Sequence, residues 1–145
     1  MASACEDDER IKDFFLSAYS SPRCLDIIRK NDAERAKKIF RAYRPDWASE
    51  QFAEAEILVS GIEYATLMTT GDPVSLETRI AGALHNILGI YGVPNEMREA
   101  KLQKVFAMDY RTLGKQVLGD FKEYVAKTND LAFRKILKNN RNVHI

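Results

Sequence analysis

Hydrophobic residues recur at helical spacing along almost the whole chain, in segments that end at proline, glycine, serine or aspartate. No segment shows the strict alternation of apolar and polar residues that is typical of a strand. The pattern predicts an all-α fold, a helical bundle with long C-terminal helices. We expect helices over residues 7–19, 22–30, 31–43, 48–69, 74–91 and 95–127, within one helical domain that spans residues 7–128. Residues 1–6 are expected to be a disordered tail, and residues 129–145 a basic tail or a short helix.

Residues with special roles at helix ends divide the chain at defined points. Ser21 is a suitable N-cap, and Pro22 suits the first position of the helix that follows it. Asn31 and Glu34 have the spacing of a capping box, which indicates that another helix begins there. Gly92 is placed to end the helix over 74–91 in a left-handed conformation.

The predicted helix over 48–69 is apolar on almost all sides. Phe52 and Val59 lie on one face, and further apolar side chains lie on the others. A helix of this kind is typical of the centre of a core. The same helix carries Glu56 and Glu63, which share one face about 10.5 Å apart by helix rise. These carboxylates either face a pocket and accept a cation or a hydrogen-bond donor, or lie at a solvated edge where they pair with lysine or arginine.

The central helix and its neighbours also offer walls for a pocket. Trp47, Tyr64 and Met68 are placed to line an apolar cavity, although aromatic and methionine side chains at helical spacing more often form simple core. We predict a ligand-binding pocket between the central helix and its neighbours. The predicted ligand-binding residues are Trp47, Glu56, Glu63, Tyr64, Met68 and His85.

Small residues form a groove on the predicted helix over 74–91, opposite its apolar face. Ala81, Gly82, His85 and Gly89 lie on this side. Glycine inside a helix costs roughly 0.5–1 kcal/mol relative to alanine, so two of them indicate close backbone approach. That approach is either a contact between subunits or tight packing within one chain. His85 is correspondingly either a pocket wall or a hydrogen-bonded core histidine.

The predicted helix over 95–127 would be roughly 50 Å long at 1.5 Å per residue, which exceeds what a domain of this size needs internally. Leu102, Leu113 and Tyr124 are eleven residues apart, a period that keeps apolar side chains in line on a nearly straight helix. We therefore expect part of it to pack against a second subunit. The predicted interface of the homodimer consists of Gly82, Gly89, Leu113, Val117 and Phe121.

Charge and cysteine content narrow the classes of function. The 145 residues include 22 Lys and Arg against 21 Asp and Glu, so a broad electrostatic surface for nucleic acid is not expected. A basic stretch over 134–141 either forms a solvated end or contacts phosphate. Cys5 and Cys24 do not form a CxxC pair, which favours a reducing cytoplasm. No apolar run is long enough for a signal peptide or a membrane span.

Patterns of catalytic and metal-binding residues are missing from the sequence. His85 has Ala81 and Gly89 four residues away on either side, so it has no second metal ligand at helical spacing. Neither a GxSxG motif nor a glycine-rich phosphate loop is present. We therefore expect no enzyme activity, no metal and no cofactor.

The stretch from Phe52 to Val125 resembles the C-terminal half of TetR-family (tetracycline-repressor-like) transcriptional regulators. The resemblance lies in residues 56–65 (EILVSGIEYA), residues 71–73 (GDP), residues 80–84 (IAGAL), residues 88–94 (LGIYGVP) and the long helix after them. Residues 7–43 fit more loosely, as the preceding helices. These are similarities of pattern over about half the chain and not a diagnostic motif.

This resemblance implies a ligand-sensing and dimerisation domain, in which two long helices of each subunit form a four-helix bundle and each subunit holds an effector pocket. The expected effector is small and apolar or cationic. The family reads DNA through an N-terminal helix-turn-helix, which this chain lacks. We therefore expect that the chain alone does not bind duplex DNA specifically. The alternative is a helical protein-interaction adaptor that has no small-molecule site.

Overall fold

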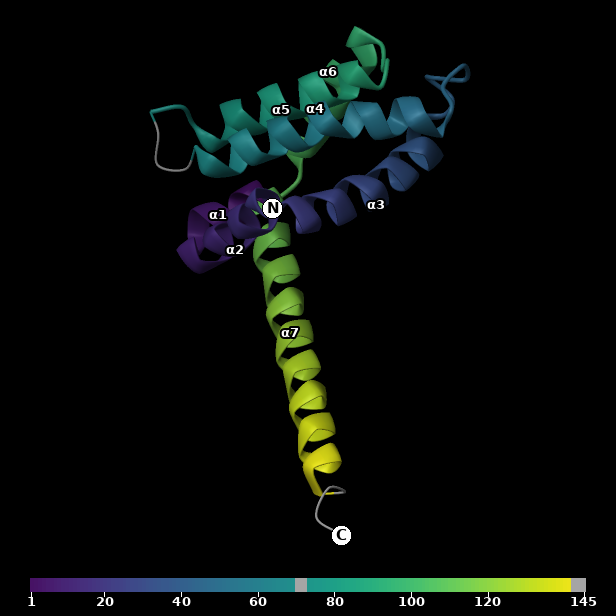
Figure 1. Cartoon of the computed structure of the whole chain (residues 1–145). Helices are drawn as coiled ribbons and strands as arrows, with labels where there is room; N and C mark the ends of the chain where they lie inside the picture. Colours follow the sequence, from purple (N-terminus) through teal and green to yellow (C-terminus); the bar gives the residue numbers. More distant parts are fainter. Residues whose placement is uncertain (70–72, 142–145) are drawn as a thin grey trace. The chain divides into compact units, whose positions relative to one another are not determined.

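The computed structural model describes residues 1–69 and 73–141, with side chains described through residue 129. Within these residues the chain forms helices joined by turns, and no strand is present. The helices are α1 (Ala2–Asp7), α2 (Glu9–Ser20), α3 (Pro22–Phe40), α4 (Ser49–Met68), α5 (Leu76–Ile90), α6 (Asn95–Ala107) and α7 (Tyr110–Arg141) (Figure 1). The prediction of an all-α fold is confirmed. The chain divides into two compact units, Met1–Tyr110 and Arg111–Ile145.

The larger unit is built around α4. This helix packs against α1, α2, α3 and α5, and α6 packs against α5. Figure 1 shows α4 and α5 running side by side. The prediction that this segment is the central helix is confirmed, and its bounds lie within one residue of the predicted 48–69.

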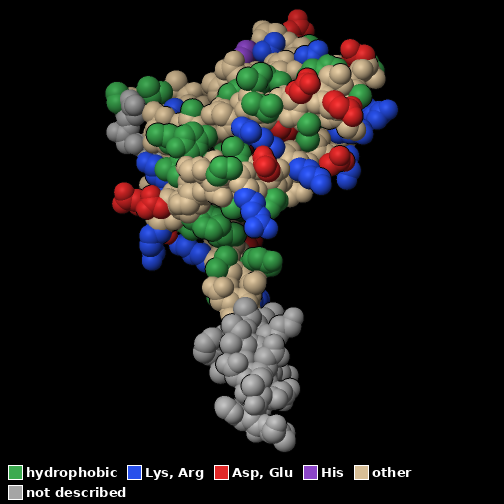
Figure 2. Space-filling model, in the orientation of Figure 1, with side chains coloured by type: hydrophobic (Ala, Val, Ile, Leu, Met, Phe, Trp, Pro, Cys, Tyr) green, Lys and Arg blue, Asp and Glu red, His purple; other side chains and the backbone are tan. Residues whose placement is uncertain are grey.

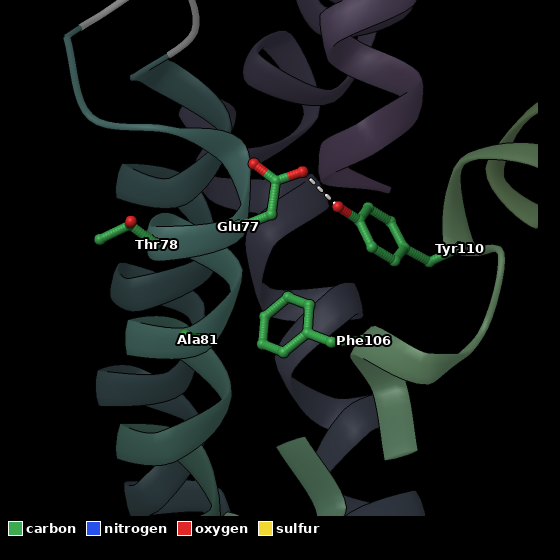
Figure 3. Close-up of a pocket in the computed structure, with 5 residues that line it drawn as sticks. All are labelled: Glu77, Thr78, Ala81, Phe106 and Tyr110. Carbon is green, nitrogen blue, oxygen red and sulfur yellow. Dashed lines mark hydrogen bonds between the residues drawn. The ribbon is translucent and has the colours of Figure 1, made fainter. Parts of the chain in front are cut away.

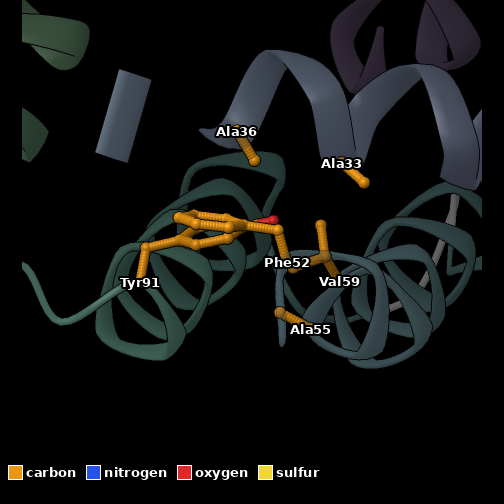
Figure 4. Close-up of a cluster of buried hydrophobic side chains, with 6 residues drawn as sticks. All are labelled: Ala33, Ala36, Phe52, Ala55, Val59 and Tyr91. Atoms are coloured by element: carbon orange, nitrogen blue, oxygen red, sulfur yellow. The ribbon is translucent and has the colours of Figure 1, made fainter. Parts of the chain in front are cut away.

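Buried aromatic rings join α3, α4 and α5 (Figure 4). The ring of Tyr91 stacks on that of Phe40, with the centroids 4.3 Å apart, and on that of Phe52, with the centroids 6.3 Å apart. The small side chains of Ala33 and Ala36 bring α3 against this cluster. Aromatic side chains bury large apolar areas, so the cluster fixes the relative positions of the three helices.

Two arginines hold the C-terminal ends of helices. Arg44 Nη2 donates a hydrogen bond to the carbonyl oxygen of Ile90 at 2.8 Å, and Arg79 Nη1 donates to that of Thr66 at 2.9 Å. Ile90 is the last residue of α5 and Thr66 lies in the last turn of α4, where carbonyls have no partner within the helix. Positive charge at these ends also interacts favourably with the helix dipole.

Two of the predicted helix ends are formed as expected. The Ser21 side chain accepts a hydrogen bond from the backbone N–H of Cys24, and Pro22 is the first residue of α3. Gly92 has a φ of 75°, and the N–H of Val93 donates to the carbonyl of Leu88 at 3.0 Å. That positive φ and the returning hydrogen bond end α5 in the way glycine favours.

The N-terminal segment differs from the predicted disordered tail over 1–6. Ala2–Asp7 forms α1, which packs against α2, α4 and α5 and buries Ser3, Ala4 and Cys5. These side chains are small or polar, so the segment has no apolar period from which a helix is predicted.

The expected break between helices at residues 30–31 is not formed either. Asn31 and Glu34 lie inside α3, which runs without interruption from Pro22 to Phe40. The buried face of α3 continues through Ala33 and Ala36, directly past the supposed cap. Packing of that face against α4 outweighs the local preference of asparagine for a helix start.

The prediction of one long helix over 95–127 is wrong. The helix α6 ends at Ala107, Met108 adopts an extended backbone (φ −85°, ψ 149°), and α7 begins at Tyr110. Leu102 and Leu113 therefore lie on two different helices, and Leu102 is buried. The helix α7 continues to Arg141, and the side chains of the basic stretch over 134–141 lie outside the described residues.

Charges of both signs are interspersed over the surface that Figure 2 shows, with apolar side chains among them. No helix of the residues that the structure describes has the length and apolar character needed to cross a membrane.

Candidate functional site

Buried polar groups lie on the inner face of α4. Glu56 is 3% exposed and Ser60, one turn later, is 2% exposed. A buried charge is unfavourable unless it is paired or hydrogen-bonded. Their hydrogen-bond partners therefore define a candidate site.

The carboxylate of Glu56 accepts a hydrogen bond from the hydroxyl of Tyr91, within the aromatic cluster. Burial raises the pKa of Glu56 above its usual value of 4.5. The negative charges of Asp32 and Glu63 raise it further, whereas the Tyr91 hydrogen bond and the positive charge of Arg29 lower it. The net direction is upward because burial, which disfavours the charged form, is the largest of these effects.

Glu63, two turns along α4, repeats this arrangement. Its Oε2 accepts a hydrogen bond from the hydroxyl of Tyr19 at 2.6 Å, which ties α4 to α2. Burial raises the pKa of Glu63 as well, and Asp32 adds to the shift. Burial also raises the pKa of the Tyr19 hydroxyl, so the phenol remains a neutral donor.

Arg29 of α3 is the cation at the centre of this group. Its Nε donates a hydrogen bond to Ser60 Oγ at 2.8 Å, and its charge acts on Glu56. Three carboxylates, those of Asp32, Glu56 and Glu63, interact electrostatically in this region. Arg29 is the positive charge that acts on Glu56, whereas Asp32 is paired with Arg35, whose Nη1 lies 3.1 Å from its Oδ1.

A pocket of about 230 Å³ opens beside these groups, between α2, α3 and α4. We call it the α2–α4 pocket. It is lined by Tyr19, Ser20, Leu25, Arg29, Ser60, Gly61 and Tyr64. The ring centroids of Tyr19 and Tyr64 lie 6.4 Å apart, and the Tyr19 hydroxyl donates its hydrogen bond to Glu63 behind the wall. The walls thus combine aromatic surface with charged and hydroxyl groups, a combination typical of small-molecule sites.

Of the six predicted ligand residues, Tyr64 lines this pocket and Glu63 accepts a hydrogen bond from its wall residue Tyr19, whereas Glu56 is bonded to Tyr91 in the aromatic cluster. Trp47 instead packs on Phe52 and under the guanidinium of Arg44, whose Cζ is 4.7 Å from the ring centroid. Met68 is half exposed near the end of α4. Whether any of these residues binds a ligand stays a prediction.

His85 is held between α5 and α6, away from the α2–α4 pocket. Its Nε2 lies 3.1 Å from Arg98 Nη1, and its Nδ1 lies 3.4 Å from a carboxylate oxygen of Glu99. Because a guanidinium only donates hydrogen bonds, Nε2 accepts and the proton of the neutral ring sits on Nδ1. His85 thus links two helices of one chain.

The predicted dimer residues occupy different surroundings. Gly89 allows a close approach, but by Arg98 of the same chain, since an added Cβ would lie 2.9 Å from Arg98 Nη1. A Cβ at Gly82 would meet nothing within 4 Å. In α7, Leu113 and Val117 are exposed and Phe121 is half-buried. Of the five predicted interface residues, Gly82 and those of α7 are accessible to another molecule, whereas Gly89 is covered by Arg98.

The outer face of α4 was not anticipated as a surface. Ile57 is 55% exposed and Leu58 is 62% exposed, and Met68 continues the same side of the helix. Between them lie Gly61 and Ala65, both exposed, and an added Cβ at Gly61 would meet nothing within 4 Å. Exposed apolar residues gathered on one face mark a contact surface. We call these five residues the outer stripe of α4.

A second pocket, of about 420 Å³, lies beside α5 (Figure 3). It is lined by Glu77, Thr78, Ala81, Phe106 and Tyr110. The hydroxyl of Tyr110 donates a hydrogen bond to Glu77, and the rings of Phe106 and Tyr110 meet edge to face. This α5 pocket has chemistry like that of the α2–α4 pocket, but its carboxylate is exposed.

Tyr19, Arg29, Ser60 and Tyr91 were not predicted as site residues. Ser60 could have been predicted from the sequence, because helical spacing places it on the same side of the helix as Glu56 and Glu63. Tyr19, Arg29 and Tyr91 come from other helices, so only the tertiary packing brings them there. Among the described residues, no group of three or more His, Cys, Asp or Glu is arranged to hold a metal ion.

Comparison of the chain with models of protein families, with curated proteins and with solved structures finds no match. The geometry of the α2–α4 pocket and of the two faces of α4 is therefore the basis on which its function is inferred.

Proposed function

We propose that this chain is the ligand-sensing and dimerisation domain of a TetR-like transcriptional regulator, and that its effector is a small organic cation. The observation that carries the proposal is the buried Glu56, with Glu63 and Asp32 nearby; Arg29 acts on Glu56, and Asp32 is paired with Arg35. The similarity of pattern over residues 52–125 supports the regulator class.

The chemistry of the pocket favours a cation that carries an aromatic or apolar group. Positive charge entering beside Tyr19 would interact with the Glu63 carboxylate behind the wall and lower the cost of its burial. The faces of Tyr19 and Tyr64 attract cations through their ring quadrupoles. The volume of about 230 Å³ limits the ligand to a small molecule.

Binding in this pocket would act on the arrangement of the helices. Its walls come from α2, α3 and α4, so a ligand that fits one arrangement better than another changes their populations. Gly61 of the outer stripe also lines this pocket, so the stripe and the pocket adjoin on the same helix. A second copy packed there would therefore sense the shift, as a sensing domain requires.

We propose that two copies associate through the outer stripe of α4. Gly61 and Ala65 leave room for a second backbone, and Ile57, Leu58 and Met68 would become buried around that crossing. A two-fold contact uses the same patch on both copies, so one self-complementary helix face is sufficient. This places the centre of the dimer on α4 instead of on the predicted Gly89.

Isothermal calorimetry on the full chain with benzylamine, benzyl alcohol and benzoate tests the cationic effector. These probes have similar shapes and carry positive, zero and negative charge at neutral pH. We expect one benzylamine per chain to bind, and the other two to bind at least about tenfold more weakly, which corresponds to 1.4 kcal/mol. Preferential binding of benzoate, or no binding of benzylamine, contradicts the proposal.

Two variants locate the binding. Glu63→Gln should weaken benzylamine binding, because it removes a charge behind the wall of the α2–α4 pocket. Glu77→Gln is the matched control, because it removes a carboxylate from the α5 pocket. Loss of binding in the control alone would move the ligand to the α5 pocket.

The alternative function, a protein-interaction adaptor without a small-molecule site, is favoured by one observation. Leu113, Val117 and Tyr124 are exposed along α7 and share one side of the helix. A chain that binds none of the three probes but loses a protein partner on Val117→Glu would fit this alternative.

A further inference from the structure

The N-terminal helix α1 is attached to the rest of its unit by few and small contacts. It has six residues, and its N-cap, Met1, makes no side-chain hydrogen bond. An isolated helix of this length is not stable in water, so α1 forms only where it is docked. Its buried side chains are those of Ser3, Ala4 and Cys5, which together bury little apolar area.

One ion pair joins α1 to α5. The guanidinium of Arg79 contacts the carboxylate of Glu6, and the Arg79 side chain is only 7% exposed. The same guanidinium donates to the carbonyl of Thr66, near the end of α4. Its Nε is buried without a hydrogen-bond partner, so the docked state leaves one donor unsatisfied. Arg79 thus connects α1, α4 and α5, and its unsatisfied donor favours release.

A hinge follows α1 directly. Asp8 has an extended backbone (φ −147°, ψ 107°), and its side chain caps α2 by accepting a hydrogen bond from the N–H of Arg10. The helix α2 has its own buried anchors, Ile11 and Tyr19. Rotation at Asp8 can therefore release α1 while α2 keeps both its cap and its packing.

We propose that α1 is a detachable strap, latched by the Glu6–Arg79 pair, which opens as a unit at Asp8 while the rest of the chain stays folded. Opening frees the shared guanidinium at the junction of α4 and α5. The position of the N-terminal helix is thereby linked to the helix that carries both the α2–α4 pocket and the outer stripe. This inference does not depend on the proposed function.

The two cysteines report on the strap. Cys5 belongs to α1 and is buried, which raises the pKa of its thiol, whereas Cys24 is exposed on α3. A thiol reagent such as Ellman's reagent should therefore modify one thiol quickly and the other slowly in the native full chain. The slow rate measures opening of α1. Cys24→Ser removes the fast phase and identifies it.

The decisive variant is Glu6→Gln, which removes the charge on the strap and leaves the bond from Arg79 to Thr66 in place. We expect the slow phase to accelerate on the order of tenfold, as for loss of a hydrogen bond to a charged group. The fast phase should not change, and global unfolding should be destabilised by no more than the same tenfold factor. Glu9→Gln, in the exposed first turn of α2, is the matched control and should leave both rates unchanged.

Low urea distinguishes local opening from global unfolding. Opening of α1 exposes little surface, so the slow labelling rate should vary weakly with urea below the unfolding transition. A slow phase that equals the global unfolding rate, or that rises as steeply with urea, overturns the proposal. So does an unchanged Cys5 rate in Glu6→Gln.

Discussion

The two faces of α4 each carry residues that are unusual for a surface helix. Glu56 and Ser60 are almost completely buried, whereas Ile57 and Leu58, their neighbours in sequence, are more than half exposed. Burial of a carboxylate and exposure of large apolar side chains are both unfavourable in an isolated chain. The proposed function completes the inner face with a ligand and the outer stripe with a second copy of the chain.

The largest difference between the faces should appear in folding stability. Phe52→Ala removes a ring that is 1% exposed from the aromatic cluster and should lower the free energy of unfolding by about 3–5 kcal/mol. Leu58→Ala, on the outer face, should change it by less than about 0.5 kcal/mol at concentrations where the chain is monomeric. Urea titration measures both. Similar losses in the two variants would mean that Leu58 is packed within its own chain.

The next effect concerns the hydrogen bond that satisfies the inner face. Tyr91→Phe leaves Glu56 without its tyrosine donor and should destabilise the chain by about 1–3 kcal/mol. Tyr124→Phe is the control, because Tyr124 is exposed. A double-mutant cycle with Glu56→Gln should give a coupling of at least about 0.5 kcal/mol. Additive effects would show that the bond contributes nothing to stability.

The raised pKa values of the inner carboxylates predict a pH dependence. Burial raises the folded-state pKa of Glu56 and of Glu63 above 4.5, so folding favours their protonated forms. This contribution to stability is fully present below the unfolded value of 4.5 and is lost as pH rises through the folded pKa. The stability of wild type relative to Glu56→Gln/Glu63→Gln should therefore fall as pH rises from 4.5. A relative stability that rises with pH instead would contradict the burial of these groups.

The smallest effect on stability is expected for a substitution at Gly61 in the outer stripe. Gly61→Ala adds a methyl group that meets nothing within 4 Å in one chain. Alanine is the better helix former, so the monomer should gain roughly 0.5–1 kcal/mol. At Gly92 the opposite is expected, because φ is 75° and an added Cβ would lie 2.8 Å from the Arg44 guanidinium. Thermal unfolding at low concentration measures both signs.

Helix periods and caps predicted most of the fold, because α4, α5 and the start of α3 depend on local signals such as Ser21, Pro22 and Gly92. Local signals failed where packing decided the outcome. Asn31 lies inside α3 because Ala33 and Ala36 continue its buried face. The break after Ala107 could not be predicted from local signals, because no proline or glycine lies there.

The candidate site was only partly predictable for the same reason. The spacing of Glu56 and Glu63 placed them on one face, but their tyrosine donors come from α2 and from the end of α5. Nothing local relates Tyr19 or Tyr91 to α4. The all-round apolar pattern of α4 also concealed its outer stripe, because periodicity does not say which of several apolar faces has a neighbour.

Sedimentation velocity of the wild-type chain and of Leu58→Glu, over a wide range of concentration, tests most directly whether the two faces of α4 have separate roles. The account predicts a concentration-dependent dimer for wild type and a monomer for Leu58→Glu with the same helix content, since Leu58 is 62% exposed in the single chain. Val117→Glu, on α7, should remain dimeric. A wild-type chain that stays monomeric throughout, or a Leu58→Glu variant that dimerises as wild type does, would contradict it.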